Sequence, residues 1–77
     1  MMDVQAFCAR LRQARKAAGL TLVDVAAILY TSESHIRRYE KGESIPSVSR
    51  VADMAELYGV SIDWLCGRDG GKKDDPV

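Results

Sequence analysis

The sequence has few residues of the kinds that build covalent or metal-bound frameworks. Its 77 residues include only two cysteines, Cys8 and Cys66, and one histidine, His35. Two cysteines do not make a disulfide framework, and no Cys-x-x-Cys or Cys/His cluster indicates a zinc site. We therefore expect a domain of a reducing compartment that needs no metal and no cofactor.

Long hydrophobic runs are missing as well. No apolar run approaches the roughly 18 residues that a membrane-spanning helix needs. In the N-terminal sequence MMDVQAFCARLR the basic residues follow the apolar ones, whereas a secretory signal peptide has them first. We therefore expect a cytoplasmic protein that does not associate with membranes.

The groups that carry catalysis are absent too. The sequence shows no paired carboxylates, no nucleophile with an adjacent base and no glycine-rich phosphate loop in a supporting context. A chain of 77 residues forms one small domain that buries only about 60% of its unfolded surface, so it hardly encloses a catalytic cleft. We therefore do not expect an enzyme.

An excess of charge of either sign is also lacking, because 11 basic residues balance 11 acidic ones. The balance hides an uneven distribution. Residues 1–41 hold seven basic and four acidic residues, whereas residues 42–77 hold four basic and seven acidic ones. A basic stretch of this kind is typical of a phosphate-binding surface, and the alternative is a set of solvated helix faces.

The first forty residues contain the pattern of two helices. Apolar residues at helical spacing predict an amphipathic helix over about residues 3–18, which Gly19 ends. Thr21 and Asp24 have the spacing of a capping box, so a short second helix is expected from Thr21 to about Tyr30. The inner positions of the two helices are Val4, Phe7, Cys8, Leu11 and Ala14, then Leu22, Val25, Ala26 and Leu29.

The next segment predicts a third helix with an unusual composition. Ser32 is a good N-cap, and the helix runs through about Lys41 to Gly42. Only Ile36 and Tyr39 are strongly apolar in it. One narrow edge therefore anchors this helix, and a polar, hydrogen-bonding face remains outside.

Two more helices and a tail follow. Ser47 caps a fourth helix that Gly59 stops, and Ser61 starts a short fifth helix ending near Cys66. The inner face of the fourth helix is expected to hold Val48, Val51, Met54, Ala55 and Tyr58. Residues 1–66 are thus predicted to form an all-α domain of five helices, and the polar residues 67–77 a disordered tail.

The most specific signal is the stretch 21–42, where a tight connection joins two short helices. Ala26 provides the small side chain that a close helix–helix approach needs. Val25, Leu29 and Ile36 form an apolar contact between the helices. Such a helix-turn-helix unit, here about residues 21–41, presents its second helix to the major groove of DNA.

Three ordered motifs extend this signal: Arg15-x-x-x-Gly19-Leu20-Thr21, Val25-Ala26-x-x-Leu29 and Ser32-x-x-x-Ile36-x-x-Tyr39-Glu40-x-Gly42. Further matches are Pro46-Ser47, Val51-x-x-Met54-Ala55 and the segment Gly59-Val60-Ser61-Ile62-Asp63-Trp64-Leu65. With them, about residues 4–66 resemble the Cro and lambda-repressor-like (XRE-type) helix-turn-helix family. The resemblance implies a compact five-helix DNA-binding domain.

The resemblance also implies which residues read bases. The family's recognition helix corresponds to residues 32–41, and its base-reading positions fall on Glu33, Ser34, Arg37 and Arg38. Arg38 is our main candidate for bidentate contact with guanine, and Arg37 contacts either a base or a phosphate. Glu33 is expected to contribute specificity rather than affinity. His35 is expected to be solvated or structural, with a phosphate contact as the alternative.

Further roles follow from the same resemblance. Arg15 and Glu40 match the family's buried ion pair, although two separate surface charges are the alternative. Phosphate contacts are expected from the start of the second helix, the end of the third and one basic residue of the first, namely from Thr21, Lys41, Gly42 and either Arg10 or Lys16. These contacts position a protein on DNA and carry little sequence information.

The C-terminal apolar residues suggest how two copies assemble. Part of the apolar cluster on the short final helix is expected to close the core. In the resembled family the same helix often forms a two-fold contact, which here is expected at Val60, Ile62, Trp64 and Leu65. A dimer would read two half-sites about 34–36 Å apart in double-stranded DNA. The sequence thus predicts a transcriptional regulator, most simply a phage-type repressor on a palindromic operator. The alternative is an antitoxin-like or other protein-interaction module.

Three departures from the family pattern affect these expectations. Leu22 stands where the family commonly has a glutamine that contacts the DNA backbone. Tyr30 stands where a left-handed glycine is common, and a bulky residue in that conformation costs roughly 1–2 kcal/mol. Val23 and Ile28 are apolar where polar residues are expected. We favour core positions for these two, and a patch for a partner is the alternative.

Overall fold

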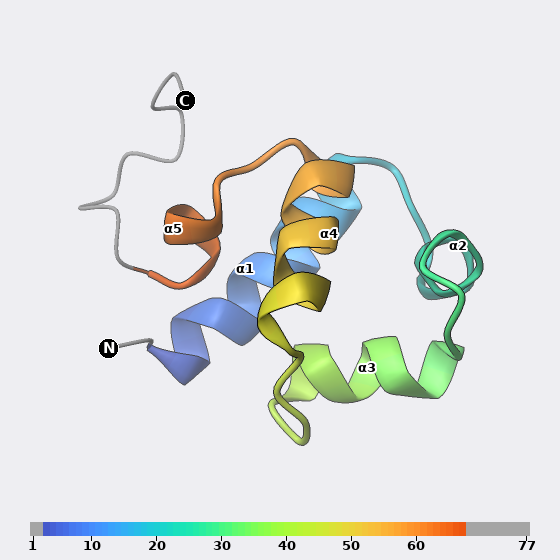
Figure 1. Cartoon of the computed structure of the whole chain (residues 1–77), viewed down its shortest axis with the longest axis horizontal. Coiled ribbons are helices and arrows are strands. Elements are labelled where there is room, and N and C mark those ends of the chain that lie inside the picture. The colour runs from blue at the N-terminus through green and yellow to red at the C-terminus, as the bar shows by residue number, and fades with distance from the viewer. Residues whose placement is uncertain (1–2, 68–77) are drawn as a thin grey trace.

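The computed structural model describes residues 3–67. Within this range the chain forms five helices and no strand: α1 (Val4–Ala17), α2 (Leu22–Ile28), α3 (Glu33–Lys41), α4 (Val48–Tyr58) and α5 (Ile62–Leu65). Helix α4 crosses in front of α1, α5 lies beside them, and α2 and α3 form the opposite part of the molecule (Figure 1). The predicted all-α, five-helix architecture is confirmed.

Side-chain caps set where the helices begin. An oxygen of the residue before each helix accepts a hydrogen bond from a backbone N–H three residues later, and the five caps are Asp3, Thr21, Ser32, Ser47 and Ser61. The predicted capping box of Thr21 and Asp24 is present. Gly42 ends α3 with a φ of 79°, a left-handed conformation that glycine adopts at little cost. The tail predicted to be disordered comprises residues 67–77, and all of these except Gly67 lie outside the described residues.

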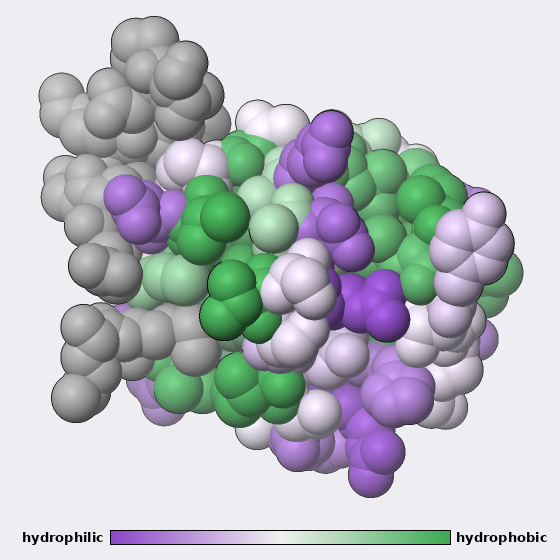
Figure 2. Space-filling view, viewed as in Figure 1, coloured by the Kyte–Doolittle hydropathy of each residue, from purple (hydrophilic) through white to green (hydrophobic). Residues whose placement is uncertain are grey.

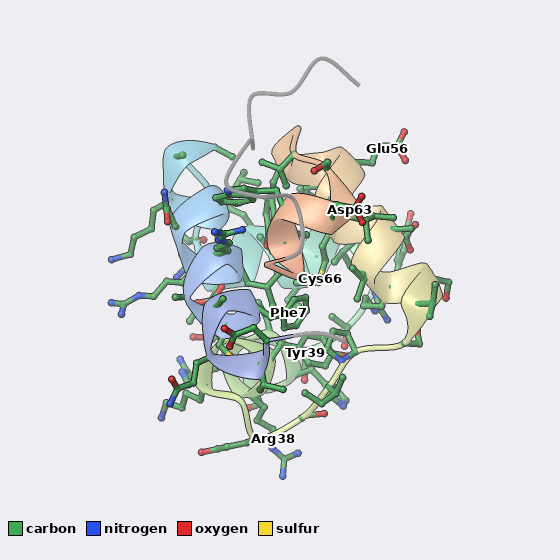
Figure 3. All side chains as sticks on the ribbon, turned by 90° about the vertical axis from the view of Figure 1, so that its left-hand side faces the viewer. Phe7, Arg38, Tyr39, Glu56, Asp63 and Cys66 are labelled. Atoms are coloured by element: carbon green, nitrogen blue, oxygen red, sulfur yellow. The ribbon has the colours of Figure 1, made fainter. Side chains whose placement is uncertain are left out.

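All five helices contribute to one core. The largest fully buried side chains are Phe7, Leu11, Val25, Ile36, Met54 and Leu65. Figure 3 shows Phe7 and Tyr39 directed into the interior, where the two apolar anchors of α3 meet α1. The narrow apolar edge predicted for α3 is therefore the edge it buries. No described helix is long and apolar enough to cross a membrane.

Two predicted core positions lie on the surface instead. Val48 is 83% exposed, and Val4 is exposed as well. Each of these residues opens its helix. Val48 lines an apolar pocket together with Phe7 of α1 and Ile62 of α5, and most of its side chain remains in contact with solvent. Cys8, predicted as a buried hydrophobe, is half-buried, because its sulfur lies beneath the exposed end of α3 beside Gly42.

The core interpretation of the two unexpected apolar residues of α2 is wrong. Val23 is 58% exposed and Ile28 48% exposed, because Val25 and Ala26 are the side chains that this short helix turns inward. Tyr30 does adopt the left-handed conformation, with a φ of 57°, and its side chain projects into solvent. These residues leave hydrophobic surface over α2, at the right of Figure 2.

The tight turn after α2 is held by main-chain bonds and by one distant arginine. The N–H of Thr31 donates to the carbonyl of Ala26 at 2.9 Å. From α4, Arg50 donates through Nη1 to the carbonyl of Leu29 at 2.8 Å. This bond satisfies a carbonyl at the end of α2 and ties the turn to the rest of the domain.

One buried side-chain hydroxyl lacks a hydrogen-bond partner. Among the described residues, the buried hydroxyl of Tyr58 makes no hydrogen bond. Burial, and to a lesser extent the nearby Glu40 charge, raise the pKa of Tyr58 to about 12, against a smaller opposing effect of Arg15. An unpaired buried hydroxyl costs stability of the order of 1–3 kcal/mol.

We predict that Tyr58→Phe leaves the free energy of unfolding at pH 7 unchanged or raises it by up to about 1 kcal/mol. In the wild type, the unfolded tyrosine ionises near pH 10 and the folded one near pH 12. The unfolded state therefore binds fewer protons in this window, and stability falls as the pH rises. Urea unfolding of both proteins at pH 7, 10 and 12 measures the difference. If the free energy of unfolding of Tyr58→Phe fell by the same amount between pH 10 and 12, ionisation of Tyr58 would not be the cause of the fall.

Candidate nucleic-acid interface

A buried ion pair fixes the position of α3. Arg15 donates through Nε to Oε2 of Glu40 at 2.7 Å and through Nη2 to Oε1 at 3.0 Å. Only 10% of the Arg15 side chain and 7% of the Glu40 side chain are exposed. A third bond, from Nη1 to the carbonyl of Leu20, reaches the segment that leads into α2. The two residues therefore form one internal link between α1, α2 and α3, not two separate surface charges.

The pKa of Arg15 is raised, first by its hydrogen bonds to Glu40 and further by the charge of that carboxylate, against the opposing effect of burial. The arginine is therefore charged at every pH at which the domain folds. Because Glu40 belongs to α3, the guanidinium and carboxylate planes also set the rotation of this helix about its axis.

The opposite face of α3 is left to solvent. Four side chains share it: Glu33, Ser34, Arg38 and Lys41 are all exposed. Figure 3 shows Arg38 pointing away from the body of the domain, at the end opposite Glu56 and Asp63. Residues 3–41 carry three more basic than acidic residues, and residues 42–67 carry three more acidic than basic ones. Arg38 on the one side, and Glu56 and Asp63 on the other, are examples of the two charge signs that lie at opposite ends of the domain.

Arg37 differs from Arg38 in its surroundings. Its Nη2 donates to Oε2 of Glu33, one turn earlier, at 2.6 Å, and both side chains are 44% exposed. Arg37 also lines a pocket on the flank of α3. The structure therefore brings Glu33 and Arg37 together at the edge of the polar face and leaves Arg38 and Ser34 at its outer surface.

The structure changes the role expected for Arg10. Its Nη1 donates to the carbonyl of Trp64, and its guanidinium lies 5.0 Å from the centre of the Trp64 ring. Arg10 therefore packs against α5, away from α3, and the phosphate contact expected of it stays a prediction that would have to compete with these interactions. Lys16 is exposed on α1 but does not line the flank of α3.

The other predicted phosphate contacts lie at helix ends. Lys41 and Gly42 end α3 and are exposed. The N–H of Thr21 already donates to the carboxylate of Asp24 at 2.9 Å. Hydrogen bonds from the Thr21 backbone and side chain lower the pKa of Asp24, which keeps this carboxylate negative beside the start of α2. A phosphate near Thr21 would therefore meet a carboxylate as well as a helix end.

The single histidine is part of the α3 cap. Nδ1 of His35 lies 3.2 Å from the hydroxyl of Thr31 and 3.3 Å from that of Ser32, and the ring is exposed. This geometry agrees with the solvated, structural interpretation. In the described part of the chain, no group of three or more His, Cys, Asp or Glu side chains could hold a metal ion.

Two of the four residues expected at a dimer contact are internal. Trp64 and Leu65 are buried in the core of the protomer, so they are unavailable to a second copy. Val60 is half-buried and Ile62 is exposed. Ile62 lines an apolar pocket of about 230 Å³ between α5 and the loop before α4, together with Phe7, Ile45, Pro46, Val48, Val51 and Cys66. Figure 2 shows hydrophobic surface in this region.

Sequence reasoning missed Arg12, Ile45 and Arg50. Arg12 lines the pocket on the flank of α3, and its spacing of three residues from Arg15 is a signal that could have placed it there. The exposure of Ile45 and the bond from Arg50 to α2 depend on contacts distant in sequence. No local pattern indicates them.

Comparisons with known proteins identify the same helix-turn-helix unit in this sequence. The helix-turn-helix family model matches residues 11–65. The chain is 36% identical over 70 residues to the uncharacterized HTH-type transcriptional regulator YobD of Bacillus subtilis, a match that covers 91% of this chain and 59% of that protein. It is 36% identical over 59 residues to the cryptic phage CTXphi transcriptional repressor RstR of Vibrio cholerae, covering 77% of this chain and 53% of the relative.

A third relative is the HTH-type transcriptional regulator ImmR of Bacillus subtilis. It is 33% identical over 60 residues, which cover 78% of this chain and 47% of that protein. The chain thus spans about half the length of the curated relatives it matches.

We predict that Arg15→Ala lowers the free energy of unfolding by about 3–5 kcal/mol, because it leaves the Glu40 carboxylate buried and unpaired. The double variant Arg15→Met, Glu40→Leu should lose much less, since it removes both charges together. Urea unfolding of the three proteins at pH 7 tests this. A loss below about 1 kcal/mol in Arg15→Ala would show that the pair does not hold the helices.

Proposed function

The chain belongs to the helix-turn-helix family of transcriptional regulators, and on that basis we propose that it is a sequence-specific DNA-binding repressor of the phage type. One observation carries the proposal. The nine-residue helix α3 is fixed to α1 by the buried Arg15–Glu40 pair and turns Ser34 and Arg38 outward. A rigid helix with an exposed polar face suits the major groove, which is about 12 Å wide.

Each side chain of this face has a role that its chemistry supports. Arg38 points away from the domain and forms a bidentate contact with a guanine. Ser34 contacts a base of either kind, and Glu33 accepts from a cytosine amino group. The pairing of Glu33 with Arg37 favours a phosphate contact for Arg37 over a base contact. Lys41 approaches the backbone at the other end of the helix, beside Gly42, whose N–H already donates to the carbonyl of Tyr39 at 3.3 Å.

Occupation of an operator then blocks a promoter sterically. Support comes from the relative RstR, whose name describes a transcriptional repressor of a cryptic phage. The zero net charge of the chain predicts weak non-specific binding, since counterion release supplies most of that affinity. Base contacts and dimerisation therefore contribute more to affinity here than in a strongly basic domain.

We place the dimer contact on the apolar surface that Ile62 shares with Ile45 and Val48. All three side chains are exposed and line or border one pocket. The loop that holds Ile45 follows α3 directly, so a two-fold contact there keeps both α3 helices near one side of a duplex. Two half-sites about 34–36 Å apart then form a palindromic operator.

A second candidate function is an antitoxin-like protein-interaction module. The exposed side chains of Val23, Ile28 and Tyr30 favour it, because they leave an apolar surface on α2 away from the pocket of Ile62. The two functions are compatible in one chain. Selection of bound sites from random double-stranded DNA separates them: enrichment of a palindrome supports the repressor, and no enrichment at any salt concentration excludes sequence-specific binding.

We predict that Arg38→Ala weakens binding to the selected site by about 1–3 kcal/mol and relaxes the preference at one base pair, because one bidentate base contact is lost. Lys41→Ala should weaken binding to all sequences alike and reduce the salt dependence. Gel shifts with the selected and a random duplex measure both. Equal losses on the two duplexes for Arg38→Ala would refute its role as a base reader.

We predict that Ile62→Glu shifts the monomer–dimer equilibrium towards monomer, because it places a charge in the apolar contact. Affinity for the full palindrome should fall, while affinity for one half-site should stay unchanged. Val23→Glu, at another exposed apolar position, on α2, is the matched control. Sedimentation velocity measures the oligomeric state, and a dimer that survives Ile62→Glu but not Val23→Glu would move the contact to α2.

A further inference from the structure

A pocket of about 300 Å³ lies where α1, the start of α2 and the second half of α3 meet. Its lining side chains are almost all charged: Arg12, Arg15, Leu22, Arg37, Glu40 and Lys41. It differs from the apolar pocket beside Ile62 in position and in chemistry.

The charges of this pocket do not cancel. Arg15 and Glu40 neutralise each other within the buried pair, and Arg37 is paired with Glu33. Within residues 3–67, neither Arg12 nor Lys41 takes part in an ion pair. Two exposed cations from different helices therefore face one cavity without a carboxylate of their own.

The position of the pocket defines what reaches it. Lys41 belongs both to the pocket wall and to the exposed face of α3 that carries Arg38. When a helix occupies the major groove, base edges lie below it and the sugar–phosphate strands border its flanks. The pocket lies on such a flank, and a phosphodiester group is the anion that would approach it.

Arg12 is the side chain of α1 placed to meet that group. It lies one turn before Arg15, which contacts α3, whereas Arg10 packs on α5 and Lys16 does not line the pocket. Leu22, at the start of α2, has no side-chain donor to offer a phosphate. The planar guanidinium of Arg12 can bind two phosphate oxygens at once.

We propose that Arg12 and Lys41 hold one phosphate of the DNA backbone in this pocket, and that Arg12 provides the donor that the side chain of Leu22 lacks. The inference rests on the proposed function and adds to it a positioning residue. Arg37 also lines the pocket, but its ion pair with Glu33 reduces the positive charge that it adds there.

The test compares Arg12→Gln, Arg12→Lys and the matched control Gln13→Glu, which makes the chain one charge more negative at the neighbouring exposed site on the same helix. Each variant of the 77-residue chain is titrated at several salt concentrations with the selected duplex and with a random duplex. Arg12→Gln should weaken both by the same factor, about three- to tenfold, and reduce the slope of log K against log salt by about 0.9. Arg12→Lys should restore most of the slope, and the preferred sequence should not change.

Gln13→Glu should change affinity by less than about twofold. An unchanged slope in Arg12→Gln, or an equal loss in Gln13→Glu, would overturn the proposal. Fluorescence of the single Trp64 checks that each variant is folded. If the wild type binds neither duplex even at low salt, the proposed function fails together with the phosphate site. If it binds and Arg12→Gln binds as well as it does, only the phosphate site fails.

Discussion

The buried pair of Arg15 and Glu40 is the interaction on which the rest of the structure depends. Helix α3 has nine residues and only two buried apolar side chains, and an isolated helix of this length is unstable in water. The pair joins it to α1 with two hydrogen bonds, and the bond to the Leu20 carbonyl includes the start of α2. Because these bonds fix the position of α3, they also determine the direction in which its exposed side chains point.

Arginines serve two distinct purposes in the described chain. Three of them, Arg10, Arg15 and Arg50, donate to main-chain carbonyls of Trp64, Leu20 and Leu29 and so bind separate elements together. Three others, on α1 and α3, are directed to the surface: Arg12, Arg37 and Arg38. A count of basic residues therefore overstates the charge that is available to DNA. Arg12, Arg37 and Lys41 line one pocket beside α3, and Glu56 of α4 and Asp63 of α5 lie at the end of the molecule opposite Arg38 (Figure 3).

The sequence was a good guide wherever local chemistry decides. Ser32 and Ser47 start helices because their hydroxyls accept from backbone N–H groups three residues later, and Ile36 and Tyr39 face inward because no other residue of α3 is apolar. It was a poor guide to Val23 and Val48. Helical periodicity gives the direction of a side chain but not whether another element covers it.

The candidate site residues also divide into those that local sequence predicts and those that depend on contacts distant in sequence. The exposed face of α3 could be predicted from its polar composition, but the direction of Arg10 could not, because a long flexible side chain reaches neighbours on either side of its helix. The charged pocket beside α3 needs three elements to meet and has no signature in any one of them.

The most direct test of the interface is an NMR titration of the ¹⁵N-labelled chain with a duplex selected from random DNA. Binding through α3 predicts the largest amide shifts at residues 33–42, with further changes at Arg12 and at the residues of the dimer contact. The amides around Glu56 on α4 should remain unchanged. Shifts concentrated on α4, with residues 33–42 unaffected, would contradict α3 as the surface that binds DNA.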